Sequence, residues 1–209
     1  MTGSSQPRGR PPASSREEIE AKAIALFLER GFAATTVTAI AAACGVSKTS
    51  FFRYYSSKSD IVWLAFDVHI ARLRSLLAES DPSVPALTAV RLAVVEALTG
   101  DADEQGIWMR RFRLIDTSPE LRDGESAHWI LWADAVSDFL VERIGCPADH
   151  VVPPVVSGAV QSLFLAQLRS WLPLSEPAGM LTRRLDAELG PLCEALQPWV
   201  DESCGAPVS

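Results

Sequence analysis

Apolar residues recur at helical spacing along almost the whole chain. In the first such stretch they are Ile19, Ala23, Leu26 and Phe27. They return every three or four positions, which is the period of one face of an α-helix. Ser14 and Ser15 each precede a glutamate by three positions, the spacing of a capping box, and Gly31 follows the last periodic residue. The pattern predicts a helix that begins at Ser14 or Ser15 and ends at Gly31.

Two shorter helices and a tight turn are predicted next. Thr36 has the position of a helix cap, and the apolar residues after it keep helical spacing as far as Gly45. Ser47 caps a further helix, which is expected to reach about Tyr55. Two short helices joined by a tight turn form a helix-turn-helix.

The rest of the chain has the pattern of helices separated by short turns. Ser57 caps a long helix that reaches about residue 80. Further helices are predicted over about 83–99, 104–116, 120–144, 153–172 and 179–199. Pro191 lies inside the last one and predicts a kink or a break there. No stretch alternates in the manner of a strand bounded by turns, so the expected fold class is all-α.

Charge is distributed unevenly along the chain. Residues 1–60 hold eight Lys and Arg against five Asp and Glu, whereas residues 61–209 hold eleven against twenty-one, and the whole chain carries −7. A basic head on an acidic body suggests that the head alone binds a polyanion. Chance asymmetry is the alternative.

Several classes of protein find no support in the sequence. No apolar run approaches the ~18 residues needed to cross a bilayer, and the N-terminus lacks the apolar stretch of a signal peptide, so we expect a cytoplasmic protein. The four cysteines form no C-x-x-C pair and are expected to be isolated thiols, so we expect no metal and no cofactor. No catalytic fingerprint occurs, so we do not expect an enzyme.

The segment RGFAATTVTAIAAACGVSKTSFFRYYSSKSDIVW resembles the DNA-binding domain of the TetR family of bacterial regulators. The matching features are RGF, T-x-x-x-I-A-x-x-x-G-V-S, the F-F-R-Y-Y helix and the S-K start of the long helix, and they cover residues 14–63. The stretches GRPP, TSFFRYY with SK-x-x-I-V-W, and MRRFRLIDTSPELR are similar to the regulators associated with mycofactocin gene clusters in actinobacteria.

The resemblance implies that different parts of the chain have different functions. A flexible arm at 1–13 would precede a three-helix helix-turn-helix DNA-binding domain at 14–58. A long helix would join this domain to a helical ligand-binding and dimerisation domain at 59–209. The implied activity is that of a ligand-responsive regulator, a repressor that binds a palindromic operator as a homodimer. A constitutive DNA-binding protein without a ligand and an all-helical enzyme are the alternatives.

The helical period separates the rings of the F-F-R-Y-Y helix into two sets. Phe51 and Tyr55 are four positions apart and are assigned to the core, whereas Thr49 and Arg53 lie opposite them with Phe52 on the flank. The outer set is expected to enter the major groove, where an arginine pairs with guanine and apolar groups contact thymine methyls. Family members mostly have Tyr at position 52, so Phe52 favours apolar contact over a phosphate bond.

Phosphate contacts are expected from the turn, the flank of the helix and the start of the long helix. By the family match Thr38 reads a base, and the two arginines of PRGRPP resemble an arm that enters the minor groove, with a solvated tail as the alternative. For the outward rings the alternative is core packing. The expected DNA contacts are Arg8, Arg10, Thr36, Thr38, Ser47, Lys48, Thr49, Ser50, Phe52, Arg53, Tyr54 and Lys58.

The resemblance also places a small-molecule effector in the C-terminal domain, and ligand pockets are mostly apolar and aromatic. The candidate lining residues are Trp108, Phe112, Trp129, Trp132 and Phe164. For each of them core packing is the alternative. The run Arg110, Arg111 and Arg113 could meet an anionic group, as in an acyl-CoA, or form a solvated helix face. Apolar stripes on the last two helices are those of a core or of a homodimer interface.

Overall fold

Helices account for all the regular structure that the computed structural model of this protein describes, which covers residues 15–99, 107–147, 149–174 and 178–204. The expected arm at 1–13, with Arg8 and Arg10, lies outside these residues. The chain divides into two compact units, with the boundary between Ile61 and Val62. We refer to them as the head and the body. Within the described residues, no helix is long and apolar enough to cross a membrane. The all-α fold class is confirmed.

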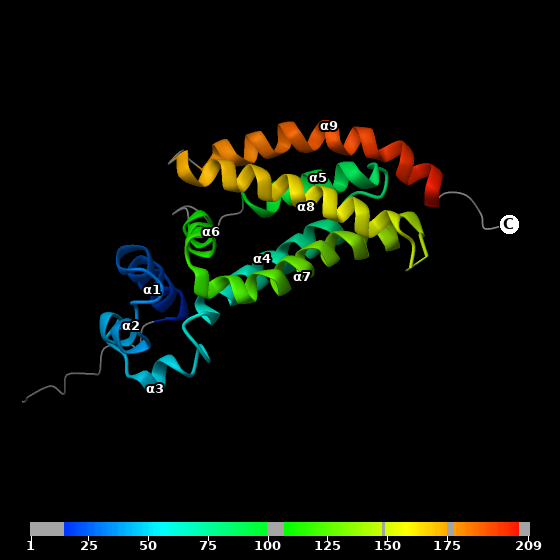
Figure 1. Ribbon diagram of the computed structural model, residues 1–209. Helices are drawn as coiled ribbons and strands as arrows, with labels where there is room; N and C mark the ends of the chain where they lie inside the picture. Colours follow the sequence, from blue (N-terminus) through cyan, green and yellow to red (C-terminus); the bar gives the residue numbers. More distant parts are fainter. Residues whose placement is uncertain (1–14, 100–106, 148, 175–177, 205–209) are drawn as a thin grey trace, which may run out of the picture. The chain divides into compact units, whose positions relative to one another are not determined.

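The head begins with helices α1 (Arg16–Arg30), α2 (Val37–Cys44) and α3 (Lys48–Phe51) (Figure 1). Each starts at a predicted cap, because the side-chain oxygens of Ser15, Thr36 and Ser47 accept hydrogen bonds from backbone N–H groups three positions later. Gly45 ends α2 at φ 67°, a left-handed conformation that glycine adopts without a steric penalty. The helix-turn-helix arrangement is thus confirmed.

The predicted extent of α3 is wrong. We expected it to reach Tyr55, but it ends at Phe51, and the N–H groups of Arg53 and Tyr54 then bond three positions back, in turns tighter than an α-helix. The Asp60 carboxylate explains the early end. It accepts hydrogen bonds from the N–H groups of Ser56 and Ser57, at 2.8 and 3.2 Å, and so draws the chain into the next helix.

Helix α4 (Asp60–Ala78) begins with a reciprocal cap. The Ser57 hydroxyl accepts a hydrogen bond from the Asp60 N–H at 3.2 Å, while the Asp60 carboxylate accepts one from the Ser57 N–H. The predicted capping role of Ser57 is therefore confirmed. Since Ile61 closes the head and Val62 opens the body, α4 is the covalent link between the two units.

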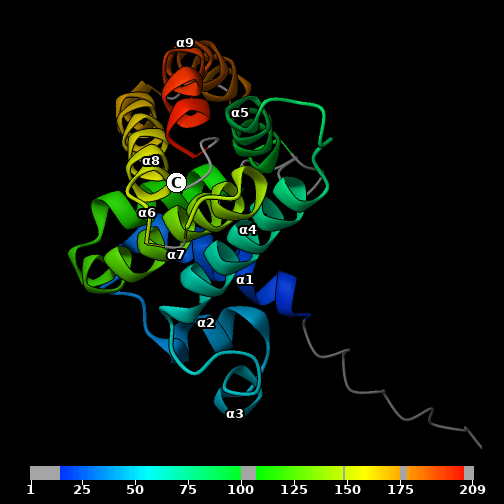
Figure 2. The same cartoon turned by 90° about the vertical axis from the view of Figure 1, so that its right-hand side faces the viewer.

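Long antiparallel helices build the body (Figures 1 and 2). Helices α8 and α9 lie side by side, α5 packs against α9, and α7 packs against α8 and α6. Their bounds are α5 (Ala86–Ala97), α6 (Ile107–Thr117), α7 (Pro119–Ile144), α8 (Val152–Trp171), the short 3-10 helix η2 (Leu172–Leu174) and α9 (Ala178–Cys204). Gly145, at φ 71°, ends α7 as the sequence indicates.

We predicted a kink or a break at Pro191, and helix α9 shows that there is no break; the kink stays a prediction. The helix continues through Pro191 and also through Pro198. A proline normally clashes with the Cβ of the residue before it, and here that residue is Gly190, which has none. Leu185 and Leu189, fully buried, hold the helix in place on the proline's N-terminal side. This burial offsets the one backbone hydrogen bond that a proline cannot donate.

We expected four isolated thiols, and this expectation is wrong for one cysteine. Cys146 is disulfide-bonded, whereas Cys44 and Cys193 are free and buried. Burial raises the pKa of the Cys193 thiol to about 11, which keeps it protonated and unreactive at neutral pH.

Candidate functional site

The rings around α3 separate into a buried pair and an exposed pair. Phe51 and Tyr55 are fully buried, with ring centroids 5.5 Å apart, and the Tyr55 hydroxyl donates to the Arg16 carbonyl at 3.3 Å. Burial raises the pKa of Tyr55, so its hydroxyl stays neutral. In contrast, Phe52 is 50 % exposed and Tyr54 is 38 % exposed. The core assignment of Phe51 and Tyr55 is confirmed, and the other two rings face outward.

Unpaired cations accompany the exposed rings. Lys48, Thr49 and Arg53 are all exposed. No residue in the described part of the chain forms an ion pair or a hydrogen bond with the side chain of Lys48 or Arg53. Two cations without a neutralising partner lie beside two exposed rings. Such a surface suits a nucleic acid, whose phosphates attract the cations.

The polar residues of the turn are placed differently from one another. Thr36 and Thr38 are exposed at the start of α2, and Ser47 is exposed at the start of α3. The oxygens of Thr36 and Ser47 already accept backbone N–H groups as helix caps. Ser50 is half-buried, and its hydroxyl lies 2.9 Å from that of Ser47. These residues thus hold the turn in shape beside the exposed cations.

Lys58 is committed to the interior contacts of the head. Its Nζ donates to the carbonyls of Phe32, Ala33 and Thr35 at 2.6, 3.3 and 3.1 Å, and it lies 4.3 Å from the centre of the Phe32 ring. The buried Thr35 hydroxyl bonds in turn to the Gly31 carbonyl at 2.8 Å. Lys58 therefore stabilises the α1–α2 connection, and its phosphate contact stays a prediction.

In the body, the sequence-predicted ligand residues come together as one cluster of rings. Phe112, Trp129, Trp132 and Phe164 are all buried. Trp132 stacks on Phe164 at 5.5 Å, and Trp129 stacks on Phe112 at 6.3 Å. Phe66 of α4 joins them edge-on, 4.8 Å from Trp129. We call these five residues the ring cluster. The side chain of Trp108, the remaining candidate, lies outside the described residues.

Beside the ring cluster is a small hollow with both apolar and charged walls. It has a volume of about 20 Å³, room for one water molecule, and Phe112 and Trp129 line it together with Glu125 and Arg169. The Trp129 indole N–H donates to Glu125 at 3.0 Å, and Arg169 pairs with the same carboxylate at 3.7 Å. A ligand larger than water would have to displace these side chains.

Two indole N–H groups in the body are buried and have no acceptor among the described residues. They are Nε1 of Trp132, in the ring cluster, and Nε1 of Trp171, at the end of α8. Leaving a buried donor unsatisfied costs about 1 to 3 kcal/mol. A bound molecule with a hydrogen-bond acceptor could satisfy the Trp132 donor.

The arginine run of α6 does not form a single face. Arg110 is exposed, whereas Arg111 is buried, and burial lowers the pKa of Arg111 to about 10. Arg113 donates to the Leu172 carbonyl at 3.0 Å. The solvated-face interpretation is therefore wrong for Arg111.

Sequence reasoning missed a contact that fastens α4 to α7. The Trp63 indole stacks on His128 at 4.4 Å, and His128 Nδ1 lies 2.8 Å from the Asp67 carboxylate. Gly124 allows this approach, because a Cβ there would lie 3.0 Å from the Trp63 indole nitrogen. These residues are about 60 positions apart, so no local pattern could have indicated the contact.

Comparison with known proteins matches both units. Residues 19–62 match the family model described as bacterial regulatory proteins, tetR family, and residues 84–197 match the one described as MftR C-terminal domain. The chain is 30 % identical over 164 residues to MftR of Mycobacterium tuberculosis, whose name ties it to the regulation of mycofactocin biosynthesis. That match covers 78 % of this chain and 83 % of MftR.

Solved structures with the same fold include two repressors of efflux pumps. NalD of Pseudomonas aeruginosa, named as the secondary repressor of the MexAB-OprM multidrug efflux pump, matches with a TM-score of 0.63 at 19 % identity, over 84 % of this chain and 95 % of NalD. SmeT of Stenotrophomonas maltophilia, solved with triclosan, matches with a TM-score of 0.64 at 17 % identity, over 86 % and 90 %. At these identities the likeness concerns the fold.

Proposed function

The chain belongs to the TetR family of bacterial regulatory proteins, and from this premise we propose that it is a repressor that binds a palindromic operator as a homodimer and is released by a small apolar or amphipathic effector. The family consists of transcriptional regulators and not of enzymes. The DNA-binding part in this proposal is residues 14–58, and the effector and dimer functions belong to residues 59–209.

The exposed residues of α3 and of the turns that follow it carry this proposal. Phe52, Arg53 and Tyr54 face solvent beside Lys48, while Phe51 and Tyr55 hold the segment to the head. Arg53 would pair with a guanine, Phe52 would contact a thymine methyl group, and Lys48 and Tyr54 would bind phosphates. Thr36, Thr38, Ser47, Thr49 and Ser50 complete the proposed surface.

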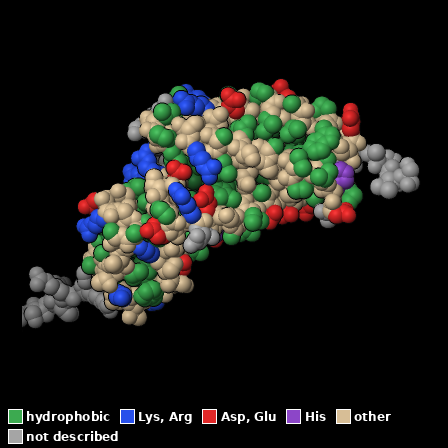
Figure 3. All heavy atoms as spheres, viewed as in Figure 1, with side chains coloured by type: hydrophobic (Ala, Val, Ile, Leu, Met, Phe, Trp, Pro, Cys, Tyr) green, Lys and Arg blue, Asp and Glu red, His purple; other side chains and the backbone are tan. Residues whose placement is uncertain are grey.

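Exposed apolar residues support a dimer through α8 and α9. Val151, which precedes α8, and Val155 are 60 % and 48 % exposed, and Trp199 of α9 is 37 % exposed. Hydrophobic side chains gather over the region of α8 and α9 in Figure 3. Burying such a face against its symmetry mate would form the four-helix packing that suits long helices.

The ring cluster is the proposed effector site. The apolar part of an effector would take the place of some contacts between the rings of the cluster. A hydrogen-bond acceptor on the effector would bind the Trp132 N–H. The fold relative SmeT was solved as a complex with triclosan, which supports a small-molecule ligand for a protein of this fold. Phe66 belongs to α4, so a ligand that moves the rings would also move α4. Operator binding requires the two α3 segments of a dimer to lie about one DNA turn apart, ~34 Å, so a small change in α4 is enough for release.

We expect operator affinity to fall steeply as salt concentration rises. Each phosphate contact releases counterions, so the logarithm of the binding constant falls linearly with that of the salt concentration. Lys48→Met should reduce this slope by about one for each protomer. The operator can be located by genome-wide footprinting, beginning near genes for mycofactocin biosynthesis, and the slope measured by fluorescence anisotropy. A response that is flat with salt would contradict the proposed surface.

An effector should be detectable through the tryptophans of the ring cluster. Titration of a compound panel should yield a compound that quenches tryptophan fluorescence saturably and releases operator DNA over the same concentration range. Trp132→Phe should then weaken its binding about tenfold through loss of one buried hydrogen bond. Trp171→Phe, which removes the other unsatisfied indole, should have no effect. Operator binding that no compound changes would favour a constitutive DNA-binding protein.

A further inference from the structure

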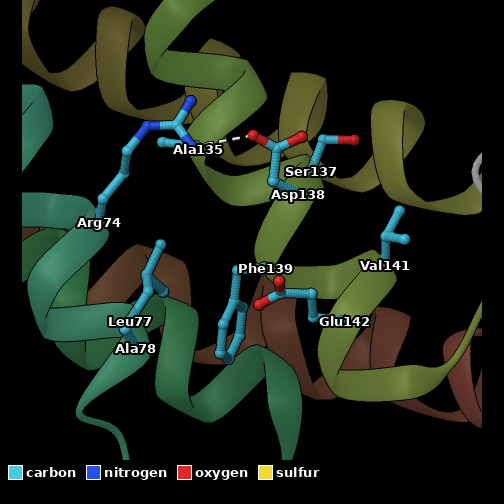
Figure 4. A pocket seen from close by; sticks show the side chains of 9 residues that line it. All are labelled: Arg74, Leu77, Ala78, Ala135, Ser137, Asp138, Phe139, Val141 and Glu142. Atoms are coloured by element: carbon cyan, nitrogen blue, oxygen red, sulfur yellow. Dashed lines mark hydrogen bonds and ion pairs between the residues drawn. The ribbon is translucent and has the colours of Figure 1, made fainter.

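A second hollow lies in the body, away from the ring cluster. It has a volume of about 490 Å³, within the range of small-molecule sites. Helix α4 supplies one wall with Arg74, Leu77 and Ala78, and α7 supplies the other wall from Ala135 onward (Figure 4). It shares no lining residue with the small hollow beside Trp129.

Short side chains leave this space open. Ala78 and Ala135 line it from the two helices, and neither can reach across. The ion pair of Arg74 with Asp138, whose Nη1 and Oδ2 atoms are 2.8 Å apart, closes the hollow at one end. Leu77 and Ala135 are buried at the base, so the floor of the hollow is apolar.

The charged groups around this floor favour a cation. Arg74 and Asp138 neutralise one another, so the pair contributes no net charge. Glu142 is exposed on the rim, and no described residue pairs with it. In Figure 4 its side chain lies next to the Phe139 ring, between the two helices. The guanidinium of Arg143 lies over the Phe139 ring at 5.4 Å and donates to the carbonyls of Ser80 and Val84 beyond the end of α4. Its charge acts on the Asp81 carboxylate there, and it forms no ion pair with Glu142.

We propose that the hollow between α4 and α7 binds an amphipathic monocation, with its apolar part on Leu77 and Ala135 and its charged group against Glu142. The ligand is of the class of alkylammonium or alkylguanidinium ions. The site is separate from the proposed effector site in the ring cluster. An occupant would bridge α4 and α7 and hold α4 in one position. The effect on DNA affinity rests on the proposed repressor function, whereas the binding itself does not.

Isothermal titration calorimetry of the full chain tests the site with octyltrimethylammonium below its micelle concentration. Octanesulfonate and octanol serve as anionic and neutral probes of the same chain length. We expect saturable binding of the cation with a Kd on the order of 1 mM or below, and weaker binding of the other two. Equal binding of the cation and the sulfonate, or no saturable binding of the cation, would overturn the proposal.

Two variants separate the charge from the cavity. Glu142→Gln should weaken binding of the cation about fivefold, which is the value of one ion pair in a water-exposed site. Binding of octanol should not change. Glu120→Gln is the matched control, because it removes an exposed carboxylate from the same helix about 33 Å away along its axis. An equal loss in both variants would show a general charge effect and would contradict the assignment of Glu142.

Ala78→Phe should fill the hollow and weaken binding of the cation at least about tenfold. The thermal midpoint of unfolding should not change, because Ala78 is an exposed residue at the end of α4. Trp129→Ala opens the ring cluster instead, and should leave cation binding in place provided that the variant retains its helical circular dichroism. Binding that survives Ala78→Phe and is lost in Trp129→Ala would place the cation in the ring cluster and refute the second site.

Discussion

Arg53→Ala is expected to abolish selective operator binding while leaving the fold intact. Each bidentate arginine–guanine contact contributes about 1 to 3 kcal/mol of discrimination. A dimer uses it twice, so selectivity should fall by about 2 to 6 kcal/mol, or roughly 30-fold to more than 10⁴-fold. The side chain is exposed, and nothing in the described part of the head pairs with it. Its loss should therefore not change the free energy of unfolding.

The measurement is an electrophoretic shift with the operator duplex and with a scrambled duplex of the same composition. Arg30→Ala is the matched control, because it removes an exposed cation from the last turn of α1 in the same unit. Arg30→Ala should weaken binding to both duplexes slightly and equally. If Arg53→Ala keeps the full preference for the operator, the assignment of α3 and its flank to base reading is wrong.

Lys58→Met is expected to destabilise the head, by about 2 kcal/mol. The Lys58 ammonium donates to three carbonyls, and hydrogen bonds that involve a charged group contribute more than neutral ones. Methionine keeps the length and apolar character of the side chain but cannot donate. The carbonyls of Phe32 and Thr35 would lose that donor, and the α1–α2 connection would loosen.

Lys48→Met is the matched control, since Lys48 is exposed and its side chain forms no hydrogen bond or ion pair with any described residue. Urea unfolding followed by circular dichroism should show a loss of stability for Lys58→Met alone. Anisotropy should show a reduced salt slope for Lys48→Met. The reverse outcome, with stability unchanged and the salt slope reduced in Lys58→Met, would assign Lys58 to a phosphate, as its place in the sequence suggests.

Several features of the head could be predicted from the sequence because they depend on neighbours within one or two helical turns. The caps at Ser15, Thr36 and Ser47 require only a hydroxyl three positions before a backbone N–H. The burial of Phe51 and Tyr55 follows from their spacing of four residues on a helical period. The ring residues of the body that lie together were named instead from the resemblance to the TetR family.

Tertiary contacts decided the rest. The end of α3 depends on the carboxylate of Asp60, and the role of Lys58 depends on carbonyls 23 to 26 positions earlier in the chain. Helix α9 continues through Pro191 because buried leucines hold it on its neighbours. The hollow beside Glu142 exists because two helices far apart in sequence present short side chains to one another. Helical periodicity assigns a residue to a face, but only the packed chain determines which groups that face meets.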